Sequence, residues 1–219
     1  MQTKQKAPRR AGRPDAQTSE ALDRHILDTA TRLFIEQGYA ATSIEQVALA
    51  AGSSKATIYR RYSCKEDLFA SVSEDMVTVI LEKAAAAERS GSDVSDPLAV
   101  LREACRALLD LAAEPAVIAV YRVLIAEAPR FPSLVDRVVQ KVHAPKEALF
   151  LRLLCAAREA GQIRLDCPVD ELFRALNGLT TGWVVHQNLL GHDSLTTEAE
   201  RTAFFNVAWA VFLNGATYS

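Results

Sequence analysis

Residues 42–69, which read TSIEQVALAAGSSKATIYRRYSCKEDLF, constrain the fold more than any other part of this 219-residue chain. Apolar residues recur there at helical spacing in two short runs, and Ala51-Gly52 separates the runs. Glycine tolerates the positive φ that a tight turn between helices requires. The stretch therefore predicts two short helices joined by a turn and followed by a longer helix. This is the layout of a helix-turn-helix, which places its second helix in the major groove of DNA.

Helix starts are indicated by two pairs of residues with capping-box spacing, in which a hydroxyl is followed three residues later by a carboxylate. Thr42 and Glu45 form one pair, at the start of the first short helix. Ser63 and Glu66 form the other, at the start of a helix that we expect over residues 63–88. That longer helix would connect the helix-turn-helix to the rest of the chain.

The second short helix carries the side chains that a DNA-reading helix needs. We expect Ser53 or Ser54 to cap it, and Ile58 and Tyr62, four residues apart, to face inward. The outer face is then left with Lys55, Ala56, Thr57, Tyr59 and Arg60. Hydroxyl, ammonium and guanidinium groups suit base edges and phosphates. Lys65, at the start of the next helix, could hold the DNA backbone. The alternative is that these charges are simply solvated.

Charge is unevenly distributed along the chain. Residues 1–62 contain ten Lys or Arg and six Asp or Glu, a net charge of +4, so the remainder carries −6 of the total of −2. A basic N-terminal part joined to an acidic remainder is typical of a protein that contacts a polyanion through one end only. Residues 1–17 contain five basic residues and almost nothing apolar, so we expect a disordered basic arm. Such an arm either contacts DNA or only increases solubility.

The rest of the chain shows helical periodicity and no alternating strand pattern, so the predicted fold class is all-α. Pro145 lies inside one long helical span and should kink or split that helix, because proline lacks the backbone donor and clashes with the preceding turn. Besides the helices already described, we expect helices over residues 18–37, 97–112, 114–127, 132–160, 168–190 and 197–214.

Several classes of protein do not fit this sequence. No run approaches the roughly 18 to 20 apolar residues that span a bilayer, and the basic N-terminus lacks the apolar core of a secretory signal, so we expect a cytoplasmic protein. The four cysteines are scattered, and we expect them to be reduced and buried. No H-E-x-x-H, G-x-S-x-G or phosphate-binding glycine loop is present, and the four histidines are isolated. We therefore expect no enzyme, no metal site and no cofactor.

About 70 residues at the N-terminal end resemble the DNA-binding domain of the TetR/AcrR family of transcriptional regulators. The match holds in order and spacing over ILDTATRLFIEQGYAATSIEQVALAAGSSKATIYRRYSCKEDLF, including Gly38-Tyr39 and Gly52. The resemblance implies that the following residues correspond to positions that contact DNA: Thr42, Ser54, Lys55, Thr57, Tyr59, Arg60 and Lys65. The chain departs from the family at Ala56, which adds a methyl group facing the groove. It also departs at Arg61, which adds a phosphate contact or pairs with an acid.

Two shorter stretches, AEAPRFPSLVDRV (residues 126–138) and AGQIRLDCPVDEL (residues 160–172), resemble the regulatory domain of the AefR-like branch of this family. The resemblance implies an N-terminal three-helix helix-turn-helix domain, residues 18–64, which binds DNA. It also implies a C-terminal helical bundle, residues 65–219, which binds a ligand and forms a homodimer. Family members are mostly repressors that a small molecule releases from DNA.

The expected partners are therefore a palindromic double-stranded DNA operator, a small lipophilic effector and a second copy of the chain, with no membrane partner. Candidate residues for the ligand pocket are Tyr121, Phe131, Phe150, Phe173, Asn177, Trp183 and His186, with Gln187 as a further polar group. Candidate residues for the dimer interface are Gly178, Gly182, Phe204, Phe205, Ala208, Trp209 and Phe212. Both sets could instead close the core of the monomer. The remaining alternative is an architectural DNA-binding protein that takes no ligand.

Overall fold

The computed structural model describes residues 16–89, 96–163 and 167–217, and within these ranges the chain is helical and has no strand. The prediction of an all-α fold is therefore confirmed. The elements are α1 (Ala16–Gln37), α2 (Ile44–Ala50), α3 (Lys55–Arg61), α4 (Lys65–Arg89), α5 (Pro97–Ala112), α6 (Pro115–Glu127), α7 (Pro132–Val138), the π-helix η1 (Val139–His143), α8 (Ala144–Glu159), α9 (Val169–Asn177), the π-helix η2 (Gly178–Gly182), α10 (Trp183–Leu189) and α11 (Glu198–Thr217).

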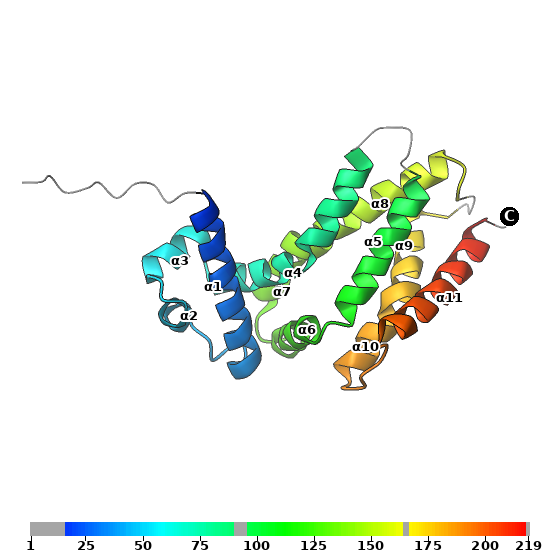
Figure 1. The fold of residues 1–219 in the computed structure, drawn as a ribbon. Helices are drawn as coiled ribbons and strands as arrows, with labels where there is room; N and C mark the ends of the chain where they lie inside the picture. Colours follow the sequence, from blue (N-terminus) through cyan, green and yellow to red (C-terminus); the bar gives the residue numbers. More distant parts are fainter. Residues whose placement is uncertain (1–15, 90–95, 164–166, 218–219) are drawn as a thin grey trace, which may run out of the picture.

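Helices α1, α2 and α3 gather at one end of the molecule, which we call the head (Figure 1). Helix α4 runs from the head into the body, where α5 and α8–α11 pack together (Figure 1). The predicted basic arm lies outside the described residues, except that α1 already begins at Ala16. No described helix combines the length and the apolar character that crossing a bilayer requires.

The start of α2 differs from the prediction by one residue. Ser43 caps the helix, and its side chain accepts a hydrogen bond from the Gln46 backbone N–H at 3.2 Å, while Gln46 Oε1 accepts from the Ser43 N–H at 2.7 Å. The hydroxyl of Thr42 is buried and donates to the carbonyls of Leu33 and Gly38, at 3.2 and 2.8 Å. The prediction that Thr42 and Glu45 form the capping box was therefore wrong, because Thr42 is used to close the turn after α1.

The start of α4 also differs from the prediction. The partner of Ser63 is Asp67 rather than Glu66: the Asp67 carboxylate accepts from the Ser63 backbone N–H at 2.9 Å and from its hydroxyl at 3.3 Å. The first helical residue is Lys65. The carboxylate still satisfies a free donor just before the helix, which is the physical purpose of such a cap.

The predicted span 132–160 is divided as Pro145 led us to expect. It consists of α7, the π-helix η1 and α8, and Pro145 lies in the first turn of α8. The N–H of Ala144 bonds to the carbonyl of Val139, five residues earlier, so the wider turn relieves the clash that proline causes in a regular α-helix.

A second π-helix, η2, lies in the predicted span 168–190 and has no proline. The hydroxyls of Thr180 and Thr181 donate to the carbonyls of Leu176 and Asn177, at 2.8 and 2.9 Å. Hydroxyl groups that bond back to the preceding turn compete with the regular helical hydrogen bonds and bend helices. This competition accounts for a local irregularity that periodicity alone did not predict.

Two hydrophobic cores stabilise the fold. The first joins the head to α4, α6, α7 and η1, and includes a ring cluster in which Tyr39 packs against Phe34, Phe69 and Phe131, with centroids 5.2–5.7 Å apart. The second lies in the body and is built from α5, α8, α9 and α11, with Trp209 and Phe150 among its members. Since the first core extends from the head into the body, movement in this part of the body can reach the helix-turn-helix.

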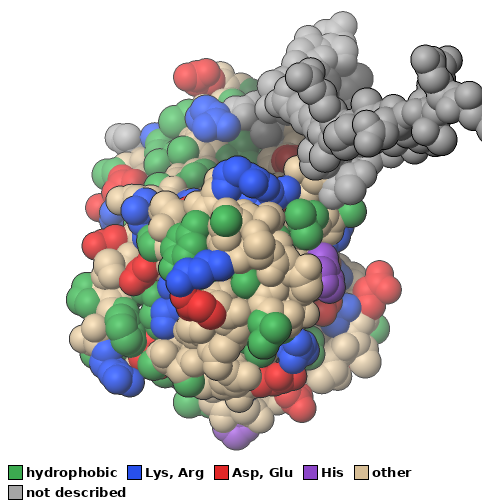
Figure 2. All heavy atoms as spheres, turned by 90° about the vertical axis from the view of Figure 1, so that its left-hand side faces the viewer, with side chains coloured by type: hydrophobic (Ala, Val, Ile, Leu, Met, Phe, Trp, Pro, Cys, Tyr) green, Lys and Arg blue, Asp and Glu red, His purple; other side chains and the backbone are tan. Residues whose placement is uncertain are grey.

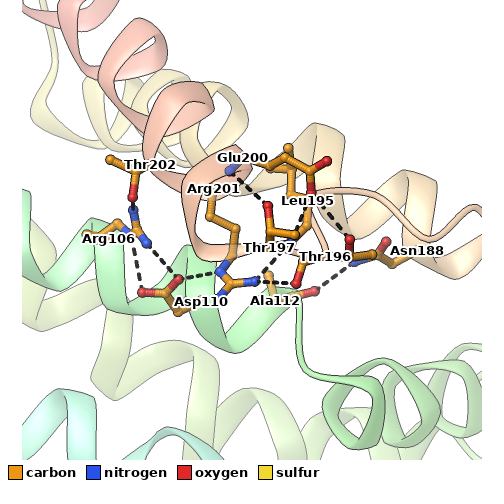
Figure 3. Close-up of polar contacts among 10 residues, drawn as sticks. All are labelled: Arg106, Asp110, Ala112, Asn188, Leu195, Thr196, Thr197, Glu200, Arg201 and Thr202. Atoms are coloured by element: carbon orange, nitrogen blue, oxygen red, sulfur yellow. Dashed lines mark hydrogen bonds and ion pairs between the residues drawn. The ribbon is translucent and has the colours of Figure 1, made fainter.

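The last helix, α11, is fixed to α5 by a polar network as well as by apolar packing (Figure 3). Arg106 and Arg201 both bond the Asp110 carboxylate, at 3.1 and 2.8 Å. Arg201 also donates to the carbonyls of Leu195 and Thr196 and so fixes the loop before α11. The outer side of α11 is therefore held in a defined position.

The cysteines lie in different surroundings, and none forms a disulfide. Cys105 is buried in the second core, and burial raises the pKa of its thiol. Cys155 is exposed, whereas Cys64 and Cys167 are half-buried. The prediction that all four are buried therefore holds fully for Cys105, only in part for Cys64 and Cys167, and was wrong for Cys155.

Candidate functional site

Helix α3 presents a polar and basic face at the far end of the head. Ser54 caps it, accepting from the Thr57 N–H at 3.0 Å, and the two hydroxyls share a hydrogen bond of 2.8 Å. Ile58 and Tyr62 are buried, as predicted, and hold α3 against the head. The outer face consists of the exposed Ser54, Lys55, Ala56, Tyr59 and Arg60 and the half-exposed Thr57. Figure 2 views this end and shows Lys and Arg side chains spread over the surface, with Asp and Glu side chains between them.

Lys55 makes the most prominent contacts on this face. It forms an ion pair with Glu45 of α2 and lies 5.6 Å from the ring centroid of Tyr59. The hydrogen bond between the Lys55 ammonium and the Glu45 carboxylate raises the pKa of Lys55 and lowers that of Glu45. Exposed pairs of this kind contribute little to stability, so a phosphate can replace Glu45 as the partner of Lys55 at small cost.

Arg61 points away from the outer face of α3. Its guanidinium pairs with Asp23 of α1 and donates to the Ser19 hydroxyl at 2.9 Å, and only 16% of its side chain is exposed. Of the two roles considered for Arg61, pairing with an acid is therefore the one that the structure supports. Its inclusion among the DNA contacts is corrected, because its charge holds α3 to α1.

Thr42 and Lys65 also turn inward. Thr42 is 1% exposed, and its hydroxyl is used within the turn after α1. The ammonium of Lys65 donates to the carbonyls of Tyr39 and Thr42, at 2.9 and 3.0 Å, and lies 4.3 Å from the ring centroid of Tyr39. Burial lowers the pKa of Lys65. Both residues therefore shape the helix-turn-helix from inside, and we remove their side chains from the predicted contact set.

A cavity of about 430 Å³ lies in the body, between α4, α5, α6, η1, α8 and η2. This volume falls within the range of small-molecule sites. Most of the lining is apolar, and both π-helices contribute to it. The lining residues are Ser73, Met76, Val77, Leu108, Leu111, Ala112, Val117, Ile118, Val120, Tyr121, Leu124, Val138, Val142, His143, Lys146, Asn177, Thr181, Gly182 and Val185.

Only two of the predicted pocket residues, Tyr121 and Asn177, line this cavity. Phe131 packs against Tyr39 in the first core, and Phe150 packs against Phe173 in the second. Trp183 and His186 are exposed, and Gln187 does not line the cavity either. The prediction was wrong for Phe131, Phe150 and Phe173, which pack within the cores, and for Trp183 and His186, which lie on the surface. Mostly smaller aliphatic residues surround the space instead.

The most informative lining residues were not predicted. His143 and Lys146, three residues apart, reach the cavity from η1 and the first turn of α8. Their signal in the sequence was Pro145, which lies between them and marks the irregular turn. Burial lowers the pKa of His143, and the nearby charge of Lys146 lowers it further.

The predicted dimer residues divide between the inside and the outside of the monomer. Phe205, Ala208, Trp209 and Phe212 are buried in the single chain, and Gly182 lines the cavity, so we correct their assignment to an interface. Gly178 is exposed, and Phe204 stacks on Trp183 with centroids 5.7 Å apart. The large apolar residues that remain exposed on η2, α10 and α11 are Leu179, Trp183, Val207 and Val211.

Comparison with known proteins is consistent with this architecture. A family described as bacterial regulatory proteins, tetR family, matches residues 26–72. The AefR-like transcriptional repressor C-terminal domain matches residues 99–215. The transcriptional regulator AcrR of Shigella flexneri is 38% identical over 91 residues, which are 42% of this chain and 41% of that protein. The chain therefore aligns with less than half of that relative.

Solved structures show the same fold. A TetR-family regulator from Mesorhizobium loti superposes with a TM-score of 0.72 at 23% identity, covering 90% of this chain and 97% of that one. FadR of Bacillus subtilis, solved in complex with stearoyl-CoA, gives a TM-score of 0.68 at 16% identity over 88% and 98% of the two chains. These matches are to transcriptional regulators, in agreement with the expectation that the chain is not an enzyme. The AefR-like match alone spans more than half of the chain, and we conclude that this protein belongs to the TetR family of transcriptional regulators.

Proposed function

We propose that the protein is a cytoplasmic, ligand-responsive repressor that binds a palindromic operator as a homodimer and leaves it when a small lipophilic effector binds. In this proposal residues 18–64 read DNA, and residues 65–219 bind the effector and form the dimer. The observation that carries the proposal is the pairing of an exposed basic helix in the head with a largely apolar cavity in the body.

DNA recognition is assigned to the outer face of α3. Ala56 and Thr57 offer methyl groups and a hydroxyl that suit base edges in the major groove. Lys55, Tyr59 and Arg60 are exposed and can donate to phosphates, or in the case of Arg60 to guanine. Arg61 and Lys65 supply no contact in this scheme, since both are engaged within the head.

Dimerisation is assigned to the outer face of η2, α10 and α11. Val207 and Val211 are 66% and 53% exposed, and the stacked pair Trp183 and Phe204 lies beside them. Contiguous apolar surface of this kind is typical of protein–protein interfaces. Contact between two copies through a twofold axis would place both α3 helices on one side, about 34 to 36 Å apart, to meet successive major grooves.

Effector binding is assigned to the cavity. The volume of about 430 Å³ and the mostly apolar lining are those of a typical small-molecule site. Its lining favours a lipophilic molecule. The solved complex of Bacillus subtilis FadR with stearoyl-CoA supports this proposal, because a protein of the same fold holds a ligand with a long apolar chain.

A connected route leads from the cavity to the head. Val142 and His143 of η1 line the cavity, while the neighbouring Lys141 bonds the Asp67 carboxylate at 2.9 Å. The Asp67 carboxylate in turn accepts a hydrogen bond from the backbone N–H of Ser63. Ser63 directly follows Tyr62, the residue that caps the C-terminal end of α3. An effector that displaces η1 would therefore move the start of α4 and the end of α3. The displacement is limited by the effector's differential affinity for the two states, and full reversal takes about 5.5 kcal/mol.

The alternative function is an architectural DNA-binding protein without a ligand. The cavity favours the regulator over this alternative, because an architectural role does not need internal space.

A DNA-release assay with two matched variants tests the proposal. The wild type and Val117→Phe, which fills the cavity, should both bind a selected operator. Lipophilic small molecules should release only the wild type and the control Val79→Phe, whose side chain is exposed on α4 outside the cavity. The proposal would be contradicted if Val117→Phe left the operator at the same compound concentrations as the wild type, or if no compound released any of the proteins.

A further inference from the structure

The charge of the cavity lining is unbalanced. Among the described residues that form the lining, Lys146 is the one Lys or Arg, and there is no Asp or Glu. The acid next to Lys146 in the sequence, Glu147, does not belong to the lining. A group that enters the cavity therefore meets one positive charge among mostly apolar walls.

Lys146 also has no partner within the described part of the chain, where it forms neither a hydrogen bond nor an ion pair. Lys65 and Lys141 differ from it in this respect, since each has two or more partners. Burial lowers the pKa of Lys146, and Glu147 only partly opposes this effect. A half-buried cation without a partner is unfavourable, and an anion bound beside it would remove that cost.

His143 provides a second polar group on the same side of the cavity. It precedes Lys146 by three residues, so the two side chains project from the same face of the chain. Its lowered pKa keeps the imidazole neutral near pH 7, and a neutral imidazole donates one hydrogen bond. Together the two residues offer one charged and one neutral donor, a set that matches a single carboxylate better than a phosphate dianion.

We propose that the cavity binds an amphipathic monoanion, namely an apolar molecule whose carboxylate lies on Lys146 and accepts a hydrogen bond from His143. This inference rests on the proposed function and narrows the class of its effector. The apolar body of the ligand would lie against aliphatic residues such as Leu111 and Val142. The carboxylate would offset the charge that the lining leaves unbalanced.

Calorimetric titration of the full chain with four probes of equal chain length tests the inference. The probes are decanoate, decanol, decylamine and decanoyl-CoA. We expect decanoate to bind the wild type roughly tenfold to a hundredfold more tightly than decanol, the range that a charge-assisted hydrogen bond supplies. Lys146→Met should abolish this preference and Lys146→Arg should keep most of it. Lys83→Met, which removes an exposed lysine of α4 outside the cavity, should behave like the wild type.

Several results would overturn the inference: binding of decanol or decylamine as tight as that of decanoate, a preference that survives in Lys146→Met, or no binding of any probe. Tighter binding of decanoyl-CoA than of decanoate would overturn the carboxylate assignment. Operator release measured on the same samples separates this inference from the proposed function. Release of the operator by decanol but not by decanoate would contradict the proposed anion site and would still support ligand-responsive regulation. A preference for decanoate over decanol in a protein that binds no operator would support the anion site and contradict the proposed regulatory function.

Discussion

Asp67 links η1, which lines the cavity, to the end of the helix-turn-helix through its contacts with Lys141 and Ser63. The substitution Asp67→Asn tests whether these contacts matter. The substitution keeps the shape of the side chain but removes the charge that Lys141 and Ser63 bond. A hydrogen bond to a charged group contributes about 1.5–3 kcal/mol. Lys141 retains Ser71 at 2.8 Å and Glu74 at 3.7 Å as partners, so we expect a loss near the lower end, about 1–2 kcal/mol of unfolding free energy.

Urea unfolding of the wild type and Asp67→Asn at a series of pH values measures this loss. Burial raises the pKa of Asp67, but hydrogen bonds from Lys141 and Ser63 outweigh it, and the net pKa lies below the ordinary value of 3.8. A carboxyl group with a depressed pKa stabilises the fold above its unfolded pKa and loses that contribution as the pH falls through its folded pKa. The difference between the two proteins should therefore be complete at pH 7, begin to shrink near the ordinary pKa of 3.8, and disappear only below the still lower folded pKa of Asp67.

A double-mutant cycle isolates the pair. Lys141→Met combined with Asp67→Asn should destabilise the protein by less than the sum of the single changes, because both remove the same contact. Equal stability of Asp67→Asn and the wild type at pH 7, or a difference that does not change with pH, would show that the Asp67 charge does not stabilise this junction. Strict additivity in the cycle would show the same of its pair with Lys141.

Three further predictions concern the head and the outer face. Lys65→Met should lower the free energy of unfolding by about 1–2 kcal/mol, because the Lys65 ammonium bonds backbone carbonyls. It should leave the slope of log binding constant against log salt concentration unchanged, and a slope smaller by about one would instead place Lys65 on a phosphate. Thr57→Ala should change the base preference in a selection experiment and alter unfolding free energy by no more than about 0.5 kcal/mol; an unchanged preference would remove Thr57 from the reading face. Val207→Glu should yield a folded monomer by light scattering, while Val79→Glu stays dimeric; a Val207→Glu dimer would contradict the assigned interface.

The helix-turn-helix could be predicted from local sequence because its determinants are local. The turn at Gly52 and the inward Ile58 and Tyr62 follow from spacing and from the conformational freedom of glycine. The exact cap of α2 could not be predicted in this way. Thr42 and Ser43 both have a capping partner three residues on, and only the burial of Thr42 in the turn after α1 decides between them.

The roles of the basic residues depended on distant contacts. Arg61 and Lys65 have the charge expected of phosphate-binding residues, yet their partners come from α1 and from the turn before α2. No spacing rule relates a side chain to a carbonyl more than twenty residues away. Exposed and buried basic residues therefore looked alike in the sequence.

The body was harder to predict because its helices are apolar on more than one side. In α11, Trp209 faces the core while Val207 and Val211 face outward, so an apolar pattern alone does not say which side a partner covers. Aromatic residues were expected in the pocket but fill the cores instead. The cavity depends on two π-helical turns, of which only the one beside Pro145 left a clear signal.

We propose that a basic helix at one end of the molecule reads duplex DNA as part of a twofold dimer. Selection of duplexes from a random pool by the purified full chain, followed by sequencing, measures DNA reading and twofold symmetry together. We expect an enriched palindrome whose half-site centres lie about 10 base pairs, or a multiple of that, apart. No enrichment of any duplex over random competitor, in the absence of small molecules, would contradict it.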